Sequence, residues 1–146
     1  MGISYSIEQG IKTACKAATD ALAIAPELRP VYRTFFGDDE PAAEDEARRL
    51  PSVMIIAGPD IPTGYQSIFS ETAVRIEIAT YAGPEQDPKG AIIKAIYESV
   101  RAVIDADTWT VTGATKKSAI IEGGESECVD MYNLVSLTLN VSTCIG

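Results

Sequence analysis

Residues 72–81 read TAVRIEIATY and alternate between two kinds of side chain. Successive side chains of a β-strand point to opposite faces of its sheet. The pattern therefore predicts a strand with one face in an apolar core and the other against polar surroundings. The apolar set is Val74, Ile76 and Ile78, and the outward set is Arg75, Glu77 and Ala79.

The segment that follows this strand predicts a helix. Apolar residues recur at steps of three and four through residues 91–105, AIIKAIYESVRAVID, as they do on the buried face of an amphipathic helix. Asp87 is expected as the N-cap and Pro88 as the first helical residue, the positions that these residue types favour.

The remaining elements are read from similar patterns. A helical stripe predicts a first helix over residues 6–25, with Ser6 and Gln9 at capping-box spacing. The stretch PVYRTFF, residues 30–36, predicts a first strand. The apolar run PSVMIIAG, residues 51–58, predicts a central strand buried on both faces, entered at Pro51. Residues 135–142 alternate and predict a half-buried last strand.

The connecting segments are rich in turn-forming residues. Residues 59–71 predict a protruding loop or the far end of a long hairpin. Residues 105–118 predict a linker of low order that contains Lys116 and Lys117, with Trp109 docked on the sheet edge. Gly123 and Gly124 are expected in a hairpin turn after a short strand. Without a glycine-rich motif leading into a helix, they do not indicate a phosphate site.

The order of these elements predicts the fold class. We expect one α+β domain over residues 1–146, with a mostly antiparallel or mixed sheet of four to five strands and two main helices on one face. The length of 146 residues fits a single domain.

The composition argues against several functions. The chain carries 12 Lys and Arg against 21 Asp and Glu, a net charge of -9, which disfavours binding to nucleic-acid phosphates. It has no histidine, which removes imidazole catalysis and imidazole metal ligands. We find no signal peptide and no apolar run of membrane-spanning length, so we expect a soluble protein made in the cytoplasm.

Candidate reactive residues are few. The three cysteines are widely spaced and are expected to be buried thiols. Glu71, Glu77 and Asp130 are candidates for acid-base chemistry or for a divalent cation, but solvated or salt-bridged carboxylates explain them better. We therefore predict no catalytic residue, no cofactor and no metal site.

Protein interfaces are better supported. Tyr65, Phe69 and Tyr132 lie beside turn segments, where exposed aromatic residues favour a protein interface. An acidic run follows the first strand, and its carboxylates indicate either a solvated loop with a short helical turn or a surface that faces a partner or a pore. Its members are Asp38, Asp39, Glu40, Glu44, Asp45 and Glu46.

Four segments, taken in order, resemble the tail terminator proteins of long-tailed bacteriophages, including that of lambda. They are RLPSVMIIAGPD, TAVRIEIATYA, DPKGAIIKAIYESVRAVI and NLVSLTLNVS. The resemblance runs from residue 50 to residue 142, with the first helix in support. Residues 108–130 depart from it most.

The resemblance implies a structural virion protein without reaction chemistry. Tail terminators form a hexameric homo-oligomeric ring that caps the tail tube protein and ends tube polymerisation. The ring also offers a joining surface to the head-tail connector or neck protein. On this basis we expect assembly in the host cytoplasm, a place at the head-tail junction, and Arg75, Glu77, Tyr65 and Phe69 as interface residues. Genomic DNA would pass through the ring without sequence-specific binding, and the acidic run would line the pore. No membrane is involved.

Two other interpretations stay open. A head-tail connector or tail completion protein uses similar small α+β subunits. A small cytoplasmic enzyme or ligand-binding domain would draw its chemistry from carboxylates and cysteine alone.

Overall fold

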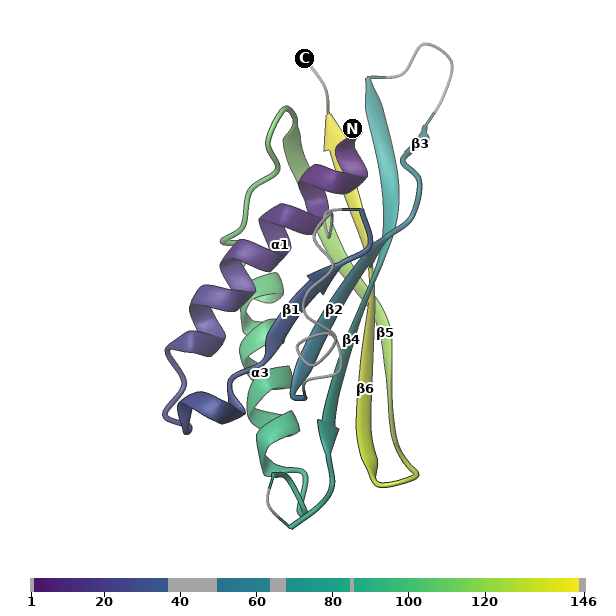
Figure 1. Ribbon diagram of the computed structural model, residues 1–146. Helices are drawn as coiled ribbons and strands as arrows, with labels where there is room; N and C mark the ends of the chain where they lie inside the picture. Colours follow the sequence, from purple (N-terminus) through teal and green to yellow (C-terminus); the bar gives the residue numbers. More distant parts are fainter. Residues whose placement is uncertain (1, 37–49, 64–67, 85, 145–146) are drawn as a thin grey trace.

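The computed structural model describes residues 2–36, 50–63, 68–84 and 86–144 (Figure 1). In chain order the elements are α1 (Ile3–Asp20), the 3-10 helix η1 (Pro26–Leu28), β1 (Val31–Thr34), β2 (Ser52–Ala57), β3 (Ile61–Pro62), β4 (Phe69–Tyr81), α3 (Ala91–Ala106), β5 (Thr115–Val129) and β6 (Tyr132–Cys144).

One mixed sheet forms the body of the molecule. Its strand order is β1-β2-β4-β6-β5, and the short β3 pairs with the start of β4. Only β1 and β2 pair in parallel, whereas the other pairs are antiparallel. The α+β class and the two helices on one face are therefore confirmed. With β3 the sheet has six strands, where four to five were expected.

Both helices cover the same face of the sheet (Figure 1). The alternation of β4 is confirmed, since its inward residues are buried and Arg75 and Glu77 are exposed. The core joins this inward set to the apolar stripes of α1 and α3 and to β6. Its fully buried members include Ile7, Ile11, Ile55, Ile76, Ile96, Leu137 and Leu139.

The first helix begins and ends earlier than predicted. It starts after Gly2, without a side-chain cap, so the capping box at Ser6 and Gln9 is wrong. The buried stripe extends back to Ser4, whose hydroxyl donates to the carbonyl of Gly58 at 2.5 Å. The helix therefore starts where it meets the end of β2.

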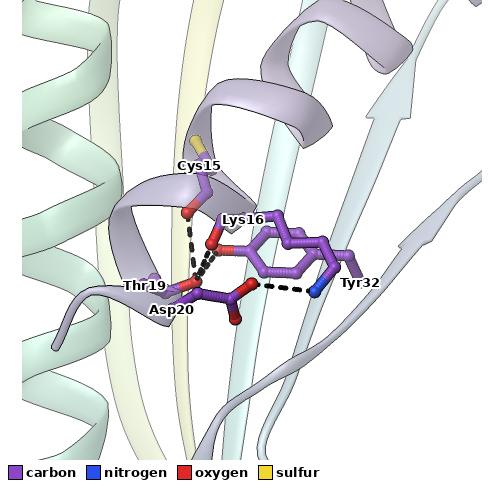
Figure 2. Close-up of polar contacts among 5 residues, drawn as sticks. All are labelled: Cys15, Lys16, Thr19, Asp20 and Tyr32. Atoms are coloured by element: carbon purple, nitrogen blue, oxygen red, sulfur yellow. Dashed lines mark hydrogen bonds and ion pairs between the residues drawn. The ribbon is translucent and has the colours of Figure 1, made fainter.

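The last turn of α1 is joined to β1 through a buried polar contact (Figure 2). The hydroxyl of Thr19 lies 3.0 Å from the carbonyl of Cys15 and 2.8 Å from the hydroxyl of Tyr32. Lys16 and Asp20 form an exposed pair beside it at 3.1 Å. The chain leaves the helix after this contact, and Pro26 opens η1.

Asp87 binds the start of α3, but not as its N-cap. That place belongs to Gly90, which has a positive φ of 72°, and Pro88 lies in the preceding turn. The Asp87 carboxylate reaches over this turn and accepts the N–H groups of Ile92 and Ile93 at 2.8 and 3.0 Å. It thus satisfies N–H groups that the first helical turn leaves without partners.

The run of residues 51–58 forms a strand buried on one face only. Val53, Ile55 and Ala57 are buried, whereas Ser52, Met54 and Ile56 are half-buried. The prediction of burial on both faces was wrong because the helices cover a single face. The other face of this strand lies on the side of the sheet that no described helix covers (Figure 1).

The largest correction concerns residues 105–126. Lys116, Lys117 and the Gly123-Gly124 pair all lie within the long strand β5, and the hairpin turn falls at Asp130 and Met131. The ladder to β6 shifts register between Ile121 and Gly123, so a bulge at Glu122 precedes the glycine pair. A bulge interrupts the alternation of apolar and polar residues, so the sequence pattern does not reveal one long strand.

Trp109 is buried between α1 and the edge strand β5, which agrees with its predicted docking at the sheet edge. The ammonium group of Lys116 lies 3.9 Å from the centroid of its ring. On the other side, a Cβ on Gly10 would come within 2.1 Å of the Thr110 carbonyl oxygen, so only glycine permits this close approach.

Candidate interaction surface

The face of the sheet opposite the helices, called the open face below, carries the predicted residues of β4. Arg75 and Glu77 are joined there by an ion pair, with Nε and Oε1 3.4 Å apart and side chains 54% and 47% exposed. A hollow of about 240 Å³ lies beside them, lined also by Met54, Leu134 and Ser136. Half-buried apolar atoms within a polar rim are typical of protein contact surfaces.

A second exposed region is the arm formed by β3 and the start of β4, which projects at the end of the sheet where α1 begins (Figure 1). Ile61, Ile68 and Phe69 are 62%, 53% and 46% exposed. The predicted interface residue Phe69 is therefore on the surface, and Ile61 and Ile68 extend it. Tyr65 lies outside the described residues.

The outer half of the β5–β6 hairpin is a third exposed region, of which the sequence indicated Tyr132, here 43% exposed, but not the long strand before it. From Glu122 to Val129 every residue of β5 is exposed. On the helix side, the buried Ile93 and the half-buried Tyr97, Ile121 and Val135 line a groove of about 610 Å³ between α3 and the hairpin. At the hairpin end, the rings of Tyr132 and Tyr81 lie 5.9 Å apart.

A buried carboxylate lies where β1 and β2 end. Glu8 is fully buried, and its two oxygens accept the N–H groups of Phe36 at 2.7 Å and Ala57 at 2.9 Å. Sequence reasoning missed this residue, although it stands next to Ile7 and falls on the apolar stripe of α1. An acidic residue on a buried stripe is itself the signal, because a buried charge needs hydrogen-bond partners.

The acidic run lies outside the described residues, so its six carboxylates are not placed. Of the three candidate carboxylates, Glu71 and Glu77 stand six residues apart on β4, and Asp130 lies in the β5–β6 turn. Within residues 2–36, 50–63, 68–84 and 86–144, no group of three or more potential metal ligands occurs.

The cysteines differ in their surroundings. Cys15 and Cys144 are buried, whereas Cys128 is exposed on β5, so the expectation that all three are buried was wrong for Cys128. Burial raises the pKa of the Cys15 thiol from 9.0 to about 12, which keeps it protonated and unreactive near neutral pH. No helix in the described part of the chain is long and apolar enough to span a membrane.

Comparison with known proteins gives a likeness of fold. No protein-family model matches the chain, and no curated protein matches it. One solved structure, described as the virion of a native gene transfer agent (GTA) particle, contains a similar chain, with a TM-score of 0.59 and 14% sequence identity. The match covers 97% of this chain and 99% of the other, so the two share one whole fold.

Proposed function

We propose that the protein is a structural component of a virion, and within that class a tail terminator. The observation that carries the proposal is the shared fold, which extends over nearly the whole of both chains and belongs, in the other chain, to a virion particle. The four sequence segments that resemble tail terminators in the same order lie on β2, β4, α3 and β6, which form most of the core.

The surface supports assembly with other protein chains. The sheet has two different end strands, β1 and β5, and one face that no described helix covers. A ring requires two different patches on each subunit that match head to tail. A sheet with unlike edges provides such patches, and a hexameric ring on the tail tube is the assembly that we propose.

The contacts follow from exposure. Arg75 and Glu77 supply polar contacts from the open face, and Phe69 supplies apolar contacts from the β3–β4 arm to the tube or to a neighbouring copy. We propose Tyr65 as a further interface residue from the sequence alone, because it lies outside the described residues. The head-tail connector binds the far side of the ring. The acidic run of residues 38–46 faces the pore, where carboxylates repel the phosphates of passing DNA.

Deletion of the gene from its parent phage tests the proposal. Without a terminator the tube continues to polymerise, so electron microscopy is expected to show tails of irregular, excessive length, and expression of the intact chain in trans should restore normal tails. Tails of normal length beside unattached heads would contradict termination and support the joining role of a connector. Normal particles would contradict both.

A further inference from the structure

On the open face, one row of residues that are paired from strand to strand has an arginine at one end and a glutamate at the other. The paired residues along this row are Arg33 on β1, Met54 on β2, Glu77 on β4, Ser136 on β6 and Glu125 on β5. Because β1 and β5 are the two end strands, the positive charge stands at one edge of the sheet and the negative charge at the other.

Each end of the row is reinforced by like charges. At the β5 edge, Glu122 and Glu127 flank Glu125, and all three are exposed. At the β1 edge, Arg29 lies four residues before Arg33. The described residues thus place an acidic and a basic patch on opposite edges of a protein whose net charge is -9.

Neither end of the row has an ionic partner in the described part of the chain. The ion pairs found there involve neither Arg33 nor Glu125. One guanidinium nitrogen of Arg33 and one of Arg29 are also buried without a hydrogen-bond acceptor among these residues. Arg29 and Arg33 are themselves partly exposed, so this edge can receive carboxylates from outside the subunit.

We propose that the occupant is a second copy of this chain: the Glu125 edge of one subunit contacts the Arg33 edge of the next. The contact is heterologous, because two different patches meet, and it repeats around a ring if the rotation closes. Complementary charge also selects the orientation, since two acidic edges or two basic edges repel. The inference rests on the proposed function, to which it adds the subunit contact.

Charge reversal tests this contact by sedimentation velocity on the full chain. Glu125→Lys or Arg33→Glu alone is expected to raise the concentration at which rings form by about tenfold or more, because each reversal opposes like charges. The double variant should return close to the wild-type concentration. Glu98→Lys, the same change on the exposed side of α3, is the matched control and should behave as wild type.

The outcomes separate the contact from the function. Single variants that form rings as readily as wild type, or a double variant no better than either single one, overturn the contact and leave the ring intact. Wild-type protein that forms no ring in solution or on tail tubes overturns the proposed function as well. Circular dichroism of each variant checks that it folds, and Glu125→Lys on the exposed strand keeps the test valid if Arg33→Glu does not.

Cross-linking in assembled particles gives an independent measurement. Arg33→Cys and Glu125→Cys are combined in one chain with Cys128→Ser, which removes the exposed native thiol. Mild oxidation is expected to give a ladder of linked subunits on a non-reducing gel. Either cysteine variant alone serves as the control and should give no ladder. Particles that contain the double-cysteine chain but give only monomer would overturn the contact.

Discussion

Replacement of Glu8 by Gln is expected to destabilise the subunit, because Glu8 holds the ends of both β1 and β2. The carboxylate has two acceptor oxygens, each bound to a backbone N–H, and it is fully buried. Gln keeps the size but has one oxygen and one NH2 group, so one of the N–H groups of Phe36 and Ala57 faces a donor. Loss of one charged hydrogen bond and an unsatisfied buried donor together cost about 2–4 kcal/mol.

Urea unfolding followed by circular dichroism measures this loss as a change in the free energy of unfolding. Glu98→Gln is the matched control, because the Glu98 side chain is 63% exposed and, among the described residues, its ion pair is the 3.9 Å surface contact with Lys94. Its effect should stay within about 0.5 kcal/mol. A Glu8→Gln variant as stable as this control would refute the role of Glu8 as acceptor for both strand ends.

Two further predictions address the strand faces and the buried thiol. The double variant Ile76→Asp, Ile78→Asp should not fold, since both side chains are buried. The double variant Arg75→Ala, Glu77→Ala should fold normally but assemble poorly, because these side chains are exposed. Solubility and ring formation are the measurements, and an equal loss of solubility in both variants would contradict the assignment of faces. Between pH 9 and pH 10 the unfolding free energy should fall by up to about 1.4 kcal/mol per pH unit, because the unfolded chain releases the Cys15 proton near pH 9 whereas the folded state holds it until about pH 12. Cys15→Ala should flatten this slope, and an unchanged slope would exclude Cys15 as its source.

Strong local periodicity made part of the fold predictable from sequence. The alternation of residues 72–81 and the helical stripe of residues 91–105 each identify one element and its buried face, and both were confirmed. Exposure of the outward residues Arg75 and Glu77 follows from the same alternation. Local patterns succeed where each residue's environment depends on its own element.

Features set by distant partners were not predictable in this way. The start of α1 depends on Gly58, and the role of Glu8 depends on Phe36 and Ala57. The length of β5 depends on pairing with β6 across a bulge, whereas the sequence predicted a turn at Gly123 and Gly124. In each case the deciding contact joins residues far apart in sequence, and no local pattern records it.

Buried acceptors at both ends of the sheet bear on assembly. At one end Glu8 binds the N–H groups that follow β1 and close β2. At the other, the Asp87 carboxylate accepts the Thr80 hydroxyl at 2.7 Å, and Asn133 donates to the Asp87 carbonyl at 3.0 Å, which joins β4, β6 and α3. These contacts fix β1 and the β5–β6 hairpin relative to each other through the strands between them. The angle between the two sheet edges decides whether head-to-tail contacts close a ring and with how many copies. In the proposed ring, polar residues that touch no neighbouring subunit therefore help to set its size.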